Sequence, residues 1–337
     1  MSRGTERTPG WIVLETFSDD HPSVVFEGTP RVFKPLTRRR NFNSSAVTEK
    51  ILKTVRSVQN GAHAEDARAA LPDGTDVLIR ALPVLGPDGV YGSQVWLGEY
   101  GQPVGEPRTV EAYSFDPVTC LTHHGPGVDR NILSINPIEA KRPSHHQIFE
   151  FYDDFSKQSD VGEYVETLVT DIPPSGDSRF FDADICLTDG RGIGRTIHVS
   201  MGYAPDAHGR PEAKGILHDV TDHVPHRVDY ALAMTKKLAA QDHPAMGRAI
   251  IDVTTGIALQ WLNPPIGALT PWLTGLPDFT EQGREAATNL RKRVLARSVY
   301  AEFTTPIRFT GTGDWIDARI GFEHYGENQG LMTVREN

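Results

Sequence analysis

Apolar and polar residues alternate in short segments along much of the chain, most clearly between residues 191 and 222. Within this stretch, Ile197–Met201 and Lys214–Val220 each show the pattern of a half-buried strand. The segment between them, Pro205–Pro211, contains aspartate, glycine and proline, which favour turns. The stretch therefore predicts a β-hairpin with one of the longer connecting loops.

The same design occurs three times along the chain. The first strand of each hairpin begins near residues 76, 192 and 314, which are 116 and 122 positions apart. Strand patterns open each unit, and helical patterns lie between the opening strands and the hairpin, as listed here: strands at 11–17, 23–27, 110–115 and 248–263; helices at 45–59, 147–155, 161–169 and 281–298. This shared order predicts an α+β protein with three similar units, each a roughly five-stranded antiparallel sheet with helices on one face.

Glycine and proline are dense at residues 101–109, which marks a linker. We therefore expect an N-terminal domain at 1–104, a middle domain at 105–222, a connecting helix at 223–243 and a C-terminal domain at 244–337. The predicted connecting helix has one apolar face. Two interpretations remain for it: packing on its own domain, or transmitting a signal or forming a homodimer.

Charge and cysteine content narrow the class of protein. The net charge of −10 argues against nucleic acid or anionic membrane as a partner, since both require a basic surface. Residues 253–277 carry no charge, but four prolines prevent a regular membrane-spanning helix there. Two cysteines, Cys120 and Cys186, are too few for a disulfide framework and favour a reducing compartment. We expect a cytoplasmic protein.

Two segments resemble sensor modules. Residues 206–222 end in Asp-Val-Thr-Asp after a glycine turn and an apolar strand, which resembles the end of a PAS domain. Residues 250–263 resemble the opening hairpin of that domain, and GAF domains are close relatives with the same layout. Through residues 10–16, 24–28, 248–253 and 261–262, the whole chain looks like actinobacterial and mycobacterial triple sensor-domain proteins, in which tandem PAS and GAF modules occur without an output domain. That resemblance implies a role in signal transduction and supplies no catalytic residues.

Few residues have the pattern of a chemical site. Cys120, His123 and His124, with the pair at 145–146, form a cluster with metal-ligand chemistry, but their spacing matches no established zinc signature and we predict no metal site. His198 alternates with apolar residues on a strand, so it either faces a ligand pocket or is a satisfied core or surface group.

Three tryptophans complete the set of candidate ligand-binding residues. Trp261, Trp272 and Trp315 lie in the third unit and either fill its core or line an aromatic pocket. The sequence contains no Gly-x-Ser-x-Gly, P-loop or His-Glu-x-x-His motif, so no catalytic residues are assigned. It identifies no cofactor.

Three functions follow from these patterns. The favoured one is a cytoplasmic sensor or regulatory adaptor that binds a small molecule or a signalling protein through tandem PAS/GAF-like domains. The second is a protein-interaction scaffold whose sensor folds hold no ligand, and filled domain interiors would favour it. The third is an unrecognised enzyme, which would require a cleft with converging polar residues.

Overall fold

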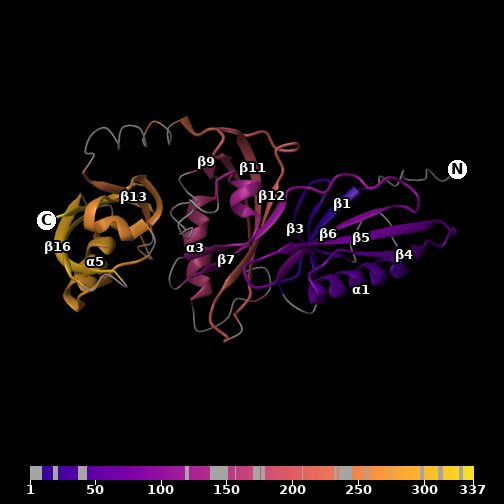
Figure 1. Ribbon diagram of the computed structural model, residues 1–337. Coiled ribbons are helices and arrows are strands. Elements are labelled where there is room, and N and C mark those ends of the chain that lie inside the picture. Colours follow the sequence, from indigo (N-terminus) through magenta and orange to yellow (C-terminus); the bar gives the residue numbers. More distant parts are fainter. Residues whose placement is uncertain are drawn as a thin grey trace.

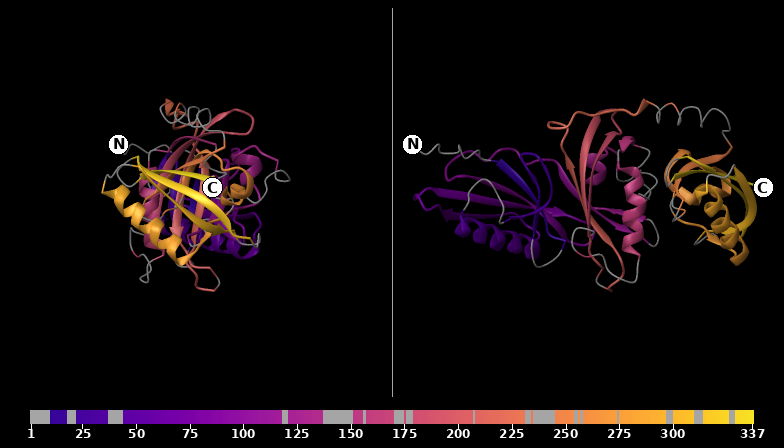
Figure 2. Two further views of the ribbon diagram at one scale, coloured as in Figure 1. Left: turned by 90° about the vertical axis from the view of Figure 1, so that its left-hand side faces the viewer. Right: turned by 180° about the vertical axis from the view of Figure 1, so that it is seen from behind.

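The computed structural model describes most of the chain, namely residues 10–17, 22–36, 44–117, 121–136, 151–155, 157–169, 175, 179–206, 208–230, 234, 245–253, 256, 258–273, 275–296, 300–309, 314–325 and 329–337. Three antiparallel sheets of six strands each dominate these residues. They lie one after another along the molecule, with the first domain at one end and the third at the other (Figures 1 and 2). None of the described helices is both long and apolar enough to cross a membrane.

The elements follow the same sequence in each domain. The first domain contains β1 (Gly10–Glu15), β2 (Ser23–Glu27), β3 (Pro30–Pro35), α1 (Ser45–Gly61), β4 (Glu65–Ala70), β5 (Asp76–Leu85) and β6 (Val90–Glu99). The middle domain contains β7 (Val110–Asp116), β8 (Leu121–His124), the π-helix η2 (Val128–Ile132), β9 (Tyr152–Phe155), α3 (Gln158–Leu168), β10 (Phe180–Thr188), β11 (Gly194–Tyr203) and β12 (Ala213–Asp219). The third contains β13 (Gly247–Asp252), β14 (Ala258–Asn263), the 3-10 helix η4 (Gly267–Leu273), β15 (Asp278–Phe279), α5 (Glu281–Leu295), β16 (Ala301–Arg308), β17 (Ile316–His324) and β18 (Gln329–Glu336).

The number of strands differs from the expected five. A common core of five strands has the same order in every sheet: the second strand of the domain, the first, and then the closing three in reverse. The sixth strand is added beside β2 in the first sheet, as β3, and at the opposite edge in the other two, as β9 and β15. β9 has four residues and β15 two, too short for an alternating pattern to reveal.

The described residues are mostly β. One further expectation about regular structure requires correction. Residues 152–155, expected to be helical, form β9, because Phe155 pairs with Ile185 of β10 and Tyr152 with Leu187. The predicted connecting helix at 223–243 stays a prediction: residues 221–229 are not helical, residues 230 and 234 are helical, and most of the remaining range lies outside the described residues.

Helix α1 shows how the apolar pattern produces the fold. Val47, Ile51, Val55 and Val58 recur at helical spacing, and all four are buried against the first sheet. The helix ends at Ala62, which has φ of 51° and donates its backbone N–H to Val58 O at 2.8 Å. The expected helix is therefore confirmed.

The first two domains share one hydrophobic core. β1 is buried on both sides: Ile12 and Leu14 pack towards α1, while Val13 belongs to a cluster that also contains residues of the middle domain. The apolar members of this interdomain core are Val13, Phe17, Val25, Phe26, Val84 and Tyr91 from the first domain, and Val110, Ala112, Ala204, Ile216 and Val220 from the middle one. The first sheet is thus covered by α1 on one face and by the middle sheet on the other (Figure 1).

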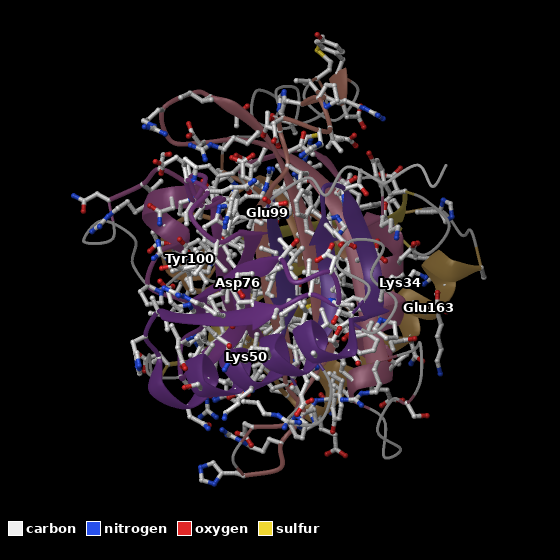
Figure 3. All side chains as sticks on the ribbon, turned by 90° about the vertical axis from the view of Figure 1, so that its right-hand side faces the viewer. Lys34, Lys50, Asp76, Glu99, Tyr100 and Glu163 are labelled. Carbon is white, nitrogen blue, oxygen red and sulfur yellow. The ribbon has the colours of Figure 1, made fainter. Side chains whose placement is uncertain are left out.

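The exposed end of the first domain is polar. Asp76 and Glu99, at the start of β5 and the end of β6, are exposed there together with Tyr100 (Figure 3). Lys50 of α1 lies on the same side of the molecule (Figure 3). Apolar burial in this domain therefore occurs beneath α1 and against the middle domain.

After β12, an interior strand, the chain crosses to the β9 edge of the middle sheet, and we call residues 221–229 the strap. At one end, Thr221 Oγ1 accepts the backbone N–H of Thr196 at 2.9 Å. At the other, the N–H of Asp229 bonds to Asp153 O of β9 at 3.0 Å. The chain therefore leaves the middle domain beside β9 before it enters the third domain.

Candidate functional site

The middle domain contains an apolar cavity between its sheet and α3. Every strand of the sheet contributes to the wall, and α3 covers it (Figure 1). The lining residues are Tyr113, Phe115, Thr122, Tyr152, Phe155, Val161, Val165, Phe181, Ile185, Val199, Met201 and Leu217. About 600 Å³ is free of protein atoms when the open side is counted. Only part of that volume lies far enough from the walls to hold an atom, so the cavity suits a compact molecule.

A second, smaller lobe adjoins this cavity under η2; about 280 Å³ is free of protein atoms there when the open side is counted, and only a small part of it can hold a ligand atom. The two lobes share four wall residues, Tyr152, Ile185, Val199 and Leu217. The remaining wall of the second lobe consists of His124, Val128, Ile132, Leu133, Leu187 and Ile197. An apolar cleft or cavity with a few polar groups is the usual character of a small-molecule site.

Two tyrosines supply hydroxyl groups to the main lobe. The Tyr113 hydroxyl lies 3.4 Å from Met201 Sδ, a weak acceptor, and Tyr152 lines both lobes. Burial raises the pKa of both phenols above their ordinary value. Both hydroxyls therefore stay protonated at neutral pH.

His124 brings an ionisable group to the second lobe. Its side chain is only 4% exposed, and Nδ1 lies 2.6 Å from Asp129 Oδ1 in η2. The other ring nitrogen, Nε2, is buried and has no hydrogen-bond partner. Because the carboxylate accepts, Nδ1 carries the proton that it donates, which leaves Nε2 for a ligand.

His198, predicted from the sequence as a ligand-binding residue, lies on the opposite face of the sheet from the cavity. Its neighbours Ile197 and Val199 line the cavity, and alternation directs His198 away from it. Its Nδ1 lies 2.7 Å from Asp184 Oδ1, and its cross-strand neighbour is His218. Any role of His198 in ligand binding therefore stays a prediction about that other face.

That other face includes a polar contact between the linker and the middle domain. Arg108 Nε donates to His218 Nε2 at 2.5 Å, and its Nη groups bond to both carboxylate oxygens of Asp222 in the strap. The ring of Phe26 meets His218 edge-on, with the centroids 4.4 Å apart. Burial, with the neighbouring Arg108 charge, lowers the pKa of His218 to about 3, so this imidazole is neutral at pH 7.

The three tryptophans do not form one site. Trp261 and Trp272 are both 4% exposed and pack in the third core with ring centroids 6.3 Å apart. Trp315 is 47% exposed, and the guanidinium of Arg308 lies 5.0 Å from its ring centroid. The structure thus separates Trp315 from the buried pair, and ligand binding by any of the three stays a prediction.

Sequence reasoning did not identify Tyr113 and Tyr152, and treated His124 only as part of a metal cluster. Thr122 and His124 are two positions apart, so they lie on the same face of β8, and this was the available signal. Cys120, His145 and His146 lie outside the described residues. Within the described part of the chain, no group of three or more metal-ligating side chains is present.

Comparisons with known proteins place the first domain and the overall fold. Residues 10–106, less than a third of the chain, match the family model described as Rv3651-like, N-terminal. No curated protein matches. The crystal structure of an uncharacterized protein from Mycobacterium tuberculosis is similar over 97% of this chain and 96% of that one, with a TM-score of 0.70 and 17% identity.

A second solved structure, an RNA-binding Light-Oxygen-Voltage receptor, covers 68% of this chain and 95% of its own, with 10% identity and a TM-score of 0.26. That score is too low to support an inference. The mycobacterial structure shows that the three-domain fold is shared, and with the family model it supports the actinobacterial side of the resemblance.

Proposed function

We propose that the protein is a cytoplasmic sensor or regulatory adaptor whose middle domain binds a small, mainly apolar molecule and relays its presence to the third domain. The observation that carries the proposal is the cavity between the middle sheet and α3, walled by apolar side chains and two protonated tyrosines. The PAS/GAF-like character of the domains is part of the proposal, supported by the five-strand order that all three sheets share.

One route from the cavity to the third domain runs through β9. Tyr152 and Phe155 of β9 line the cavity, while Asp153 between them holds the strap. The Asp153 carboxylate accepts from Thr188 Oγ1 at 2.6 Å and lies 2.9 Å from His226 Nε2, and its backbone carbonyl accepts from Asp229. A ligand that displaces Tyr152 would therefore move the start of the tether to the third domain.

A second route runs through α3. Val161 and Val165 of α3 face the cavity, and Gly162 contacts the third domain. The contact is close: a Cβ atom placed on Gly162 would lie 2.2 Å from Asp252 Oδ2 of β13. A ligand that lifts α3 would push on the third domain directly. If the ligand binds one arrangement of the middle and third domains more tightly than another, it would shift the population towards that arrangement.

The scaffold alternative fits the third domain better than the middle one. The interior of the third domain is filled by Trp261, Trp272 and Phe309, whose rings lie within 6.3 Å of one another in contacting pairs. We infer that this domain contributes a surface for a protein partner and that the middle domain contributes the ligand site. The proposal includes no catalytic step.

The test combines native mass spectrometry with a cavity-filling variant of the full chain. We expect the purified protein to retain a small molecule, or to gain thermal stability with one from an apolar metabolite panel. Val165→Phe should weaken that binding at least tenfold because the ring occupies the cavity. Glu163→Leu, on the exposed side of the same helix (Figure 3), is the matched control and should bind normally. Equal binding by both variants, or none by the parent chain, would refute the proposal.

A further inference from the structure

We infer that the second lobe selects an acidic ligand: a compact apolar molecule with one ionisable O–H, as in a carboxylic acid or a phenol, whose oxygen bonds to His124 Nε2. This inference rests on the proposed function, because it names the chemical class that the middle domain would bind. It adds a binding residue, His124, and a positioning residue, Asp129.

The fold fixes the direction of the His124 ring. On β8, His124 lies directly opposite Tyr113 of β7, and opposed residues of an antiparallel pair point to the same side of the sheet. The side chain therefore joins the cavity wall, and its 4% exposure shows that it does not reach solvent. Asp129, in the π-helix that covers this lobe, holds Nδ1 at 2.6 Å and sets the orientation of the ring.

Nε2 is then the polar atom of this lobe that lacks a partner. A buried acceptor left without a hydrogen bond costs roughly 1–3 kcal/mol, so such an atom in a folded protein calls for an explanation. Apart from His124 and Tyr152, the side chains that line the lobe are aliphatic and offer no hydrogen bond. A ligand group in the lobe would supply the hydrogen bond that His124 Nε2 lacks.

An acid is the best chemical complement to this arrangement. A neutral imidazole accepts the acid proton, or an imidazolium donates to the carboxylate or phenolate, and both forms contain the same single proton between nitrogen and oxygen. Asp129, which holds Nδ1 at 2.6 Å, keeps Nε2 directed towards that oxygen. An ammonium ion would bring three N–H donors to one acceptor and leave two of them buried without partners.

The main lobe completes the fit. A carboxylate has a second oxygen, and the Tyr152 phenol, which burial keeps protonated, is a polar group that lines both lobes. The apolar remainder of the ligand then lies along Val199 and Leu217, which also belong to both lobes. Glu111, two residues before Tyr113 on β7, accepts from Asn131 Nδ2 at 2.6 Å and is not part of the lining.

The test compares octanoic and benzoic acid with their methyl esters by isothermal titration calorimetry on the full chain. We expect each acid to bind at least tenfold more tightly than its ester, and His124→Phe to abolish that preference while ester binding is unchanged. His198→Phe is the matched control, since that histidine is equally buried but faces away from the cavity. Asp129→Asn preserves the shape of the site and should reduce acid binding several-fold.

A nitrogen-15 NMR spectrum of the imidazoles provides a measurement that does not depend on a variant folding. Octanoate should shift the Nε2 resonance of His124 and leave that of His198 in place. Equal affinity for acid and ester, or an unmoved His124 resonance, would overturn this inference while leaving the proposed function standing. If neither acid, ester nor any compound of the apolar panel binds, the proposed function fails as well.

Discussion

The middle and third domains have the same strand order, yet the middle domain holds an apolar cavity, whereas the described interior of the third domain is packed with aromatic side chains. The difference lies in where the large residues sit on the first two strands. In the third domain Ala249 of β13 pairs with Trp261 of β14, and the indole of Trp261 fills the interior. In the middle domain Tyr113 faces the smaller His124, and Phe115 faces Thr122, so space remains beside the second strand. The placement of large and small residues on these two strands therefore distinguishes the two interiors.

The largest expected effect comes from giving the third domain a cavity of its own. Trp272→Ala removes a buried indole, and we expect the free energy of unfolding of this domain to fall by about 3–5 kcal/mol in denaturant titrations. Indole added to the variant should recover part of the loss, since engineered apolar cavities bind aromatic molecules. Trp315→Ala, at the exposed tryptophan, is the control and should cost under about 1 kcal/mol. Similar losses in both variants would contradict the comparison.

A smaller effect is expected at the turn between β10 and β11, which holds the cavity strands in register. The Asp189 carboxylate is fully buried and accepts from Ser134 Oγ and the N–H groups of Ile193 and Arg191. Burial alone would raise its pKa, but these bonds and Arg195 outweigh it and hold the pKa at about 2. Asp189→Asn should therefore cost about 2 kcal/mol at pH 7.

The stabilisation that the Asp189 carboxylate provides should depend on pH. The folded-state pKa lies below that of the unfolded chain, so the stabilisation is complete above about pH 4 and is lost as the pH falls towards 2. Thermal unfolding of the two proteins should converge over that interval. A difference that stays constant down to pH 2 would show that the carboxylate acts through shape and not through charge.

The smallest effect concerns the face of each sheet that points away from α3 in the middle domain and away from α5 in the third. His218 is buried between the domains with its pKa lowered to about 3, whereas the corresponding face of the third sheet has the apolar group Ile250, Leu262 and Leu331. Because the unfolded chain takes up a proton near pH 6.5, stability should fall by about 1 kcal/mol between pH 7 and 5.5 on account of this residue. His218→Gln, which can still accept from Arg108, should remove this part of the pH dependence of the free energy of unfolding. If the variant shows the same pH dependence as the parent, a group other than His218 causes it.

Much of the fold could be predicted because its strands alternate cleanly. The three closing hairpins, the opening strands and helices α1, α3 and α5 follow from apolar spacing within ten to twenty residues. The short strands β9 and β15 could not be found in this way, because their pairing with β10 and β16 comes from tertiary structure. The expected five strands were therefore one too few per sheet.

The candidate site was less accessible from sequence. Alternation on β11 divides its residues into two faces, but only the packing shows that Ile197 and Val199 face the cavity and His198 the other side. A tryptophan has the same local pattern whether it fills a core, as Trp272 does, or lies at the surface, as Trp315 does. A cavity depends on the combined volume of side chains from several strands, which no local pattern records.

The interdomain core of the first two domains has a consequence for how the chain unfolds. Val13, Val25 and Tyr91 complete their burial on Ile216 and Val220, so neither domain presents a finished surface without the other. The described core clusters of the third domain, in contrast, contain residues 249–334 only. In terms of folding cooperativity, the first two domains should therefore unfold together as one unit, whereas the third domain has a core of its own and should unfold separately.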